Sequence, residues 1–102
     1  MFVVFLLARF KAVIVGASRE LSVEYAKFFR ALGHRIRSLR TGRELSQEDM
    51  ISYGFSVRHW QMLEAGRPST IFTLLRVCEA FEIPAEEIVA GLGPNFQKRR
   101  KQ

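Results

Sequence analysis

Cysteine is almost absent from this sequence, because Cys78 is the single one among 102 residues. No disulfide can form within the chain, so the cysteine framework of a small secreted domain is missing. Cys78 falls within an apolar helical pattern, and we interpret it as a small core residue. The two histidines, His34 and His59, have no second metal ligand at a useful spacing, so no metal site is predicted.

The residue sets that enzymes need are missing too. Catalysis requires a nucleophile with its base, paired carboxylates, a metal cluster or a phosphate-binding loop, and the pattern contains none of these. The acidic residues are scattered over expected helix starts, where capping and the helix dipole account for them. We therefore expect a protein that is not an enzyme and that uses no cofactor.

The sequence has no hydrophobic run long enough to span a membrane, which takes about 20 mostly apolar residues. Residues 1–8 are apolar, Arg9 and Lys11 interrupt the run, and residues 12–15 are apolar again. A secretory signal would carry its positive charge before the apolar run rather than after it. We expect a cytoplasmic protein.

The apolar N-terminal extension, residues 1–20, leaves three interpretations open. Residues 1–16 could form a strand or helix that packs on the domain or on a partner chain. They could lie at a membrane surface, or they could be an unstructured extension translated from an over-long start. Their content of Val, Ile and Phe slightly favours a strand.

Negative charge is scarce relative to positive charge. The formal net charge is +6 and the pI is about 10.3. A basic balance favours a polyanionic partner, with nucleic acid first and an anionic membrane second. The length predicts one domain, which we place at residues 21–93, followed by a basic tail at residues 94–102.

Capping residues and helical spacing predict the first helices of this domain. The first begins between residues 18 and 22, with Ser22 as its cap, and it stops at Gly42. The second begins at Ser46, which forms a capping box with Asp49, and it ends at Gly54.

Three further helices are expected after this point. The third begins at Ser56 and stops at Gly66, and the fourth begins at residue 69 or 70. The last has Pro84 in its first position and ends at Gly91. The fourth helix has an apolar stripe made of Ile71, Leu74, Leu75, Cys78 and Phe81.

Two short capped helices joined by a tight glycine turn can project the second helix from a bundle, and a helix fits the major groove of B-DNA. At this point the sequence resembles the Cro/C1-type, or XRE, helix-turn-helix family of phage repressors and bacterial transcriptional regulators. Residues 32–40 resemble its first helix and residues 73–81 its fourth. The motif residues between them are Leu45-Ser46-Gln47-Glu48-Asp49-Met50, Gly54-Phe55-Ser56, Trp60 and Leu63-Glu64-Ala65-Gly66.

The resemblance implies an all-α, five-helix bundle like that of lambda repressor, with the third helix reading DNA. It implies that Trp60 and Leu63 are buried, and that Arg40 and Glu64 form a structural ion pair. It also implies that Gln47 contacts phosphate, as the glutamine that starts the second helix. The recognition-helix positions that face DNA are Ser56, Val57, Arg58, Gln61 and Met62.

The side chains themselves indicate the kind of contact that each could make. Arg58 suits guanine, Gln61 suits adenine or phosphate, and Val57 suits a thymine methyl group or local packing. Met62 lies one step outside the apolar stripe and is interpreted as a base contact rather than partial core. The expected phosphate contacts are Gln47, Ser56, His59, Arg43 and Arg67.

Two departures from the family pattern matter for these expectations. The segment between Leu45 and Gly54 and the loop between Gly66 and Thr73 are each one residue shorter than usual, and the first change could rotate the second helix against the third. We expect a homodimeric, sequence-specific transcriptional regulator that binds double-stranded DNA. The alternatives are an antitoxin-like or adaptor module that binds protein, and membrane-surface association through residues 1–16.

Overall fold

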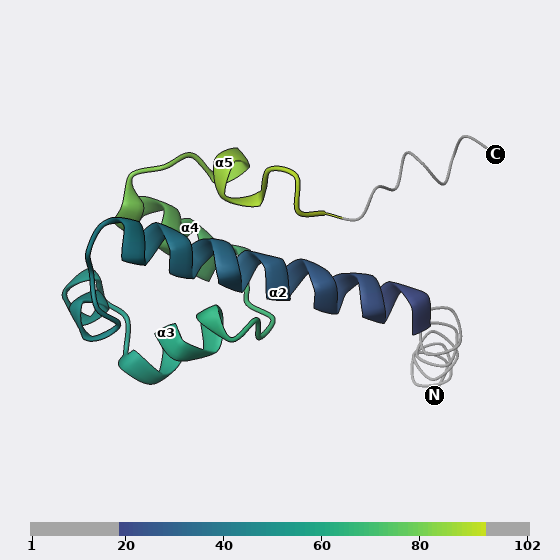
Figure 1. The fold of residues 1–102 in the computed structure, drawn as a ribbon, viewed down its shortest axis with the longest axis horizontal. Coiled ribbons are helices and arrows are strands. Elements are labelled where there is room, and N and C mark those ends of the chain that lie inside the picture. The colour runs from purple at the N-terminus through teal and green to yellow at the C-terminus, as the bar shows by residue number, and fades with distance from the viewer. Residues whose placement is uncertain (1–18, 94–102) are drawn as a thin grey trace, which may run out of the picture.

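The structure, a computed structural model, describes residues 19–93, and residues 1–18 and 94–102 lie outside this range. The expectations for the apolar extension before residue 19 and for the basic tail therefore fall outside the described residues. Within residues 19–93 the chain is helical and has no strand, as the predicted all-α class requires. The elements in order are α2 (Arg19–Gly42), the 3-10 helix η1 (Glu48–Tyr53), α3 (Val57–Glu64), α4 (Ile71–Phe81) and α5 (Ala85–Val89) (Figure 1).

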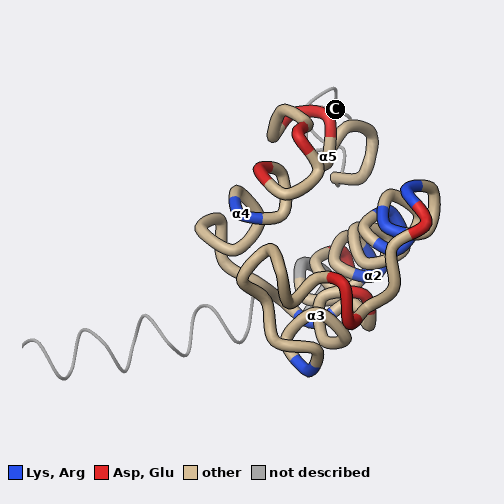
Figure 2. Tube along the Cα trace, turned by 90° about the vertical axis from the view of Figure 1, so that its left-hand side faces the viewer, with Lys and Arg blue, Asp and Glu red and all other residues tan. Residues whose placement is uncertain are grey.

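The helices surround a small core. The long helix α2 and the helix α4 form two walls, and α3 and α5 lie at opposite ends of the space between them (Figures 1 and 2). The ring of Trp60 meets Phe55 and Phe81 edge to face, at centroid distances of 5.0 and 5.8 Å. Phe55 lies in the turn before α3, and buried apolar side chains from all five elements complete the core: Leu32, Ile36, Met50, Leu63, Val77, Cys78 and Ile88.

Serine and threonine side chains cap α3 and α4 as predicted, whereas η1 begins at Glu48, after Gln47, although the expected hydrogen bonds between Ser46 and Asp49 are present. The Ser46 hydroxyl accepts a hydrogen bond from the Asp49 backbone N–H at 3.0 Å, and the Ser46 N–H donates to the Asp49 carboxylate at 2.7 Å. Ser56 and Thr70 each accept a hydrogen bond from the backbone N–H three residues further on. Because a cap needs only its own side chain and a nearby backbone group, the sequence pattern was sufficient to place these starts.

Two expectations about helix ends and faces were wrong. Ser22 lies inside α2 rather than at its cap, because the helix already begins at Arg19. Ile71 and Leu75 do not belong to the buried face of α4, since they are 73% and 50% exposed. The face that packs inward instead carries Thr73, Val77, Cys78 and Phe81.

The α2 backbone lies directly against the end of α3. A Cβ atom on Gly33 would lie 2.8 Å from the carbonyl oxygen of Leu63, so only glycine allows this approach. Gly66 has φ +85°, and a Cβ atom on it would lie 2.9 Å from the Cα of Arg30. The first turns of α2 extend past the other helices (Figure 1). Among residues 19–93, no helix is both long and apolar enough to cross a bilayer.

Candidate nucleic-acid interface

Helix α3 has one buried face and one free face. It is separated from η1 by a turn in which Gly54 adopts φ +90°, so the two helices are distinct elements. Trp60 is fully buried and Leu63 is 5% exposed, as predicted. The opposite face presents Arg58, Gln61 and Met62 to solvent. The helix therefore has a fixed inner side and an outer side that a partner could contact.

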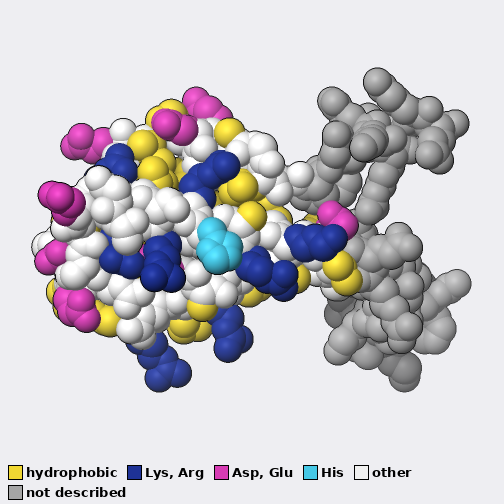
Figure 3. All heavy atoms as spheres, viewed as in Figure 1, with side chains coloured by type: hydrophobic (Ala, Val, Ile, Leu, Met, Phe, Trp, Pro, Cys, Tyr) yellow, Lys and Arg dark blue, Asp and Glu magenta, His cyan; other side chains and the backbone are white. Residues whose placement is uncertain are grey.

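Arginine side chains lie on and near α3, while the exposed Glu48 and Asp49 lie on the neighbouring η1. Figure 3 shows Lys and Arg side chains across the middle and the lower edge of one face, over α2 and α3, while Asp and Glu side chains gather mostly at its left and upper margins. The side chains of Arg58 and Arg67 are exposed and form no hydrogen bond within residues 19–93. Both guanidinium groups are thus available for a phosphate or a base edge.

The ion pair expected between Arg40 and Glu64 is present. The two side chains form a bidentate contact with N–O distances of 2.5 and 3.0 Å, and they are 9% and 6% exposed. Arg40 also donates to the carbonyl oxygen of Leu45 at 2.8 Å. A single guanidinium group therefore ties the end of α2 to the end of α3 and to the loop before η1. Its hydrogen bond with Glu64 raises the pKa of Arg40, so the guanidinium group stays positively charged.

The Glu64 carboxylate accepts hydrogen bonds from α2, from α3 itself and from the turn before η1. Besides Arg40, it accepts hydrogen bonds from the Trp60 indole at 2.5 Å and from the Gln47 amide at 3.1 Å. Burial alone would raise the pKa of Glu64, but the hydrogen bonds and the Arg40 charge outweigh burial, and the pKa lies below its ordinary value. This carboxylate is therefore charged at neutral pH, and it holds α3 in place.

Gln47 connects this network to the outer face of α3. Its amide N–H donates to Glu64, and its carbonyl oxygen accepts a hydrogen bond from the Gln61 amide at 3.2 Å. Gln61 keeps its own carbonyl oxygen and a second N–H, which is the donor and acceptor pair that adenine requires. The phosphate contact expected of Gln47 stays a prediction. One N–H of its amide group has no hydrogen-bond partner within residues 19–93, and this N–H is the donor that a phosphate would use. The segment between Leu45 and Gly54, which is one residue shorter than in the family pattern, contains η1, and η1 is a 3-10 helix.

Other predicted positions surround the N-terminus of α3. The Ser56 hydroxyl caps the helix by accepting the His59 N–H at 3.0 Å, and the His59 ring is half-buried against Phe55. Val57 is half-buried, and Met62 is 42% exposed, so Met62 is not core. The phosphate contacts expected of Ser56 and His59 stay predictions; the start of a helix attracts phosphate, but the His59 N–H already donates to the Ser56 hydroxyl.

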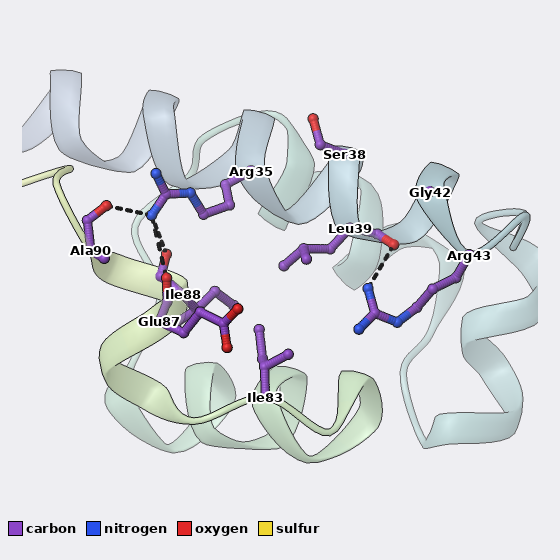
Figure 4. Close-up of a pocket in the computed structure, with 9 residues that line it drawn as sticks. All are labelled: Arg35, Ser38, Leu39, Gly42, Arg43, Ile83, Glu87, Ile88 and Ala90. Carbon is purple, nitrogen blue, oxygen red and sulfur yellow. Dashed lines mark hydrogen bonds between the residues drawn. The ribbon is translucent and has the colours of Figure 1, made fainter.

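The structure places Arg43 away from α3, and the phosphate contact expected of it stays a prediction. Its guanidinium group donates to the carbonyl oxygens of Leu39 and Phe81, at 3.2 and 2.9 Å, and lies over the Phe81 ring. Figure 4 shows Arg43 turned into the groove between α2 and α5, on the side of the bundle opposite α3. This arginine joins the end of α2 to the end of α4, so we assign it a structural role.

Sequence reasoning missed two further structural arginines. Arg76 of α4 donates to the carbonyl oxygen of Gly54 at 2.5 Å and lies over the Phe55 ring at 4.4 Å, so it braces the turn before α3. Arg35 donates to carbonyl oxygens at the C-terminal end of α5, including that of Ala90 at 2.6 Å (Figure 4). Both donate to carbonyl oxygens more than 20 residues away in the sequence, so no local pattern could have indicated them.

No protein-family model, curated protein or solved structure matches this chain. Residues 19–93 contain no cluster of three His, Cys, Asp or Glu side chains that could hold a metal ion. Cys78 is buried, and burial raises the pKa of its thiol. The geometry around α3 is therefore the main guide to function.

Proposed function

We propose that this protein is a sequence-specific DNA-binding transcriptional regulator of the helix-turn-helix type, with α3 as the recognition helix. One observation carries the proposal: α3 is anchored by the buried Trp60 and by the Glu64 network, while its outer face remains polar and exposed. A rigid helix with free side chains on one face can enter a major groove and read base edges. The order of the motif residues from Leu32 to Phe81, which resembles that of the Cro/C1-type family, is the second support for the proposal.

Within this proposal the side chains divide into two groups. Arg58 and Gln61 read bases, with Val57 and Met62 contacting apolar base edges. Arg67, Ser56 and His59 hold the phosphate backbone, and Gln47 orients Gln61.

The proposal includes a homodimer, because one short helix reads too few base pairs to select a site. Two recognition helices would enter half-sites separated by about one helical turn, roughly 34–36 Å. The apolar side chains at the start of α4 suit the contact with a second copy, since Ile71 and Phe72 are 73% and 71% exposed. Helix α4 follows directly after the turn that carries Arg67, so this surface lies beside the proposed DNA face.

Selection of binding sites from a random duplex library tests the proposal. The full chain should enrich a two-fold symmetric sequence, and log K for that sequence should fall with log salt by about 0.9 per phosphate contact. Failure to enrich any sequence, with no salt-dependent affinity for duplex DNA, would reject the proposal.

A protein-binding adaptor or antitoxin-like module is the second candidate. The observation that favours it is the same exposed apolar surface on α4, which a different protein could cover. In that case the chain would bind its partner with a salt dependence unrelated to phosphate contacts, and random DNA selection would enrich nothing.

A further inference from the structure

We propose that residues 1–15 of this chain pack into an apolar groove between the N-terminal part of α2 and the turn that joins α3 to α4. The groove has a volume of about 470 Å³. Tyr25, Ala26 and Phe29 line it on the α2 side, with Ser22 and Arg30 as the polar residues of that wall. Ala65, Gly66 and Pro68 line the opposite side. The inference concerns this surface alone and does not depend on DNA binding.

The described residues leave this part of the molecule poorly covered. The first turns of α2 extend beyond the other helices (Figure 1). Tyr25 is 48% exposed, and Ala26 beside it is exposed as well. Phe29, which also lines the groove, is half-buried and packs against the core. An apolar groove of this kind is stabilised when apolar side chains replace the water in it.

The composition of residues 1–15 fits the groove. Every residue in this segment is apolar except Arg9 and Lys11. Gly16, Ala17 and Ser18 separate the segment from the first residue of α2, and small residues permit the reversal that would return the chain along the helix.

The length of the segment fits as well. From residue 22 to residue 30 the α2 wall of the groove spans about 12 Å, at about 1.5 Å per helical residue. Fifteen residues would span roughly 22 Å as a helix and more in an extended form, so either conformation covers the groove.

Attachment to the same chain favours this occupant over a second copy. A segment joined to the groove by a few residues has an effective concentration on the order of millimolar, which a separate molecule does not reach at ordinary protein concentrations. The tethered segment therefore occupies the groove first.

Hydrogen–deuterium exchange of the full chain tests the proposal. The backbone amides of residues 1–15 should exchange at least about tenfold more slowly than those of an unstructured peptide. In the variant Ala26→Glu, which places a carboxylate in the groove, this protection should be lost. The new Glu lies one turn before Arg30, and that spacing supports the helix, so exchange in the core helices should not change.

The variant Val23→Glu is the matched control. Val23 is exposed on the same turns of α2 but does not line the groove, and a Glu there lies one turn before Lys27 in the same way. Protection of residues 1–15 should survive this change. Pro68→Glu, on the opposite wall of the groove, should abolish protection as Ala26→Glu does, and it provides a second test if Ala26→Glu disturbs the fold.

Three outcomes would overturn the proposal. Residues 1–15 could exchange at peptide rates in the unmodified chain. Their protection could persist in both groove variants, which would place the segment elsewhere. Protection could also rise with protein concentration, which would assign the groove to the segment of a second copy.

Discussion

Gly33 in α2 lies so close to the end of α3 that a Cβ atom on it would sit 2.7 Å from the carbonyl oxygen of Glu64. The contact is between two backbones, so neither side can relieve a clash by rotating a side chain. The side chain of the same Glu64 receives Arg40 from the last turn of α2. Helix α2 therefore sets the position of α3 twice, once by close packing and once by a buried ion pair.

Gly33→Ala should destabilise the fold by about 1–3 kcal/mol, which is the usual cost of overpacking a tight contact. Urea denaturation monitored by Trp60 fluorescence measures the loss. Gly42→Ala is the matched control, because a Cβ atom at Gly42 meets nothing within 4 Å. That variant should be neutral or slightly stabilising, and an equal loss in both variants would show that the α2–α3 contact is not as close as described.

Arg40→Met should lower the free energy of unfolding by roughly 3 kcal/mol, because it leaves the buried Glu64 carboxylate without its main partner. Adding Glu64→Gln to Arg40→Met should cost less than the sum of the two single changes, since the second change removes the unpaired charge. A complete double-mutant cycle by chemical denaturation provides the numbers. Strict additivity would mean that the two side chains do not stabilise the protein as a pair.

The stability of the protein should depend on pH through Glu64. The pKa of this carboxyl in the folded state lies below its ordinary value of 4.5, so the unfolded state takes up the proton first as the pH falls. The stabilisation is therefore complete above about pH 4.5 and is lost as the pH falls from there through the folded-state pKa. Over this pH range, the free energy of unfolding of the unmodified protein should fall towards that of Glu64→Gln. Denaturation at a series of pH values measures this difference. Glu79→Gln, which removes an exposed carboxylate, is the control, and a constant difference between the protein and Glu64→Gln at all pH values would contradict the assignment.

Phe72→Glu should weaken the proposed homodimer at least about tenfold, because it places a charge in the apolar surface assigned to the second copy. Analytical ultracentrifugation measures the change. Ile51→Glu is a control on η1, where Ile51 is 58% exposed and lies outside the Ile71 and Phe72 surface, and it should leave association unchanged. If the chain is monomeric at all concentrations, or if the dimer is insensitive to Phe72→Glu, then the surface at the start of α4 does not form a homodimer contact.

Local signals in the sequence predicted the Ser46–Asp49 capping box, the helix starts at Ser56 and at residue 69 or 70, and the burial of Trp60. Each cap depends on groups within three residues, and Trp60 shares a helical spacing with the buried Leu63. The same kind of signal failed for α4. Ile71 was placed inside because it is apolar, although the helix turns this residue outward and buries the polar Thr73.

The structural arginines could not be predicted because their partners are distant carbonyl oxygens. Arg43 donates to an oxygen 38 residues away and Arg76 to one 22 residues away. The residue type indicates only that an arginine can bind phosphate. It cannot show that the guanidinium group already donates hydrogen bonds to backbone carbonyl oxygens of the same protein. The Arg40–Glu64 pair was predictable only through the family resemblance.

The most direct test of the central claim compares Arg58→Ala with Arg67→Ala on the selected DNA site and on a scrambled duplex. We predict that Arg58→Ala loses about 1–3 kcal/mol on the selected site and little on the scrambled one, because Arg58 reads a base. Arg67→Ala should weaken both equally and lower the salt slope by about one, while Lys27→Ala, on the projecting turns of α2, should change neither. Equal losses on both duplexes for Arg58→Ala would contradict the proposal that α3 reads the sequence.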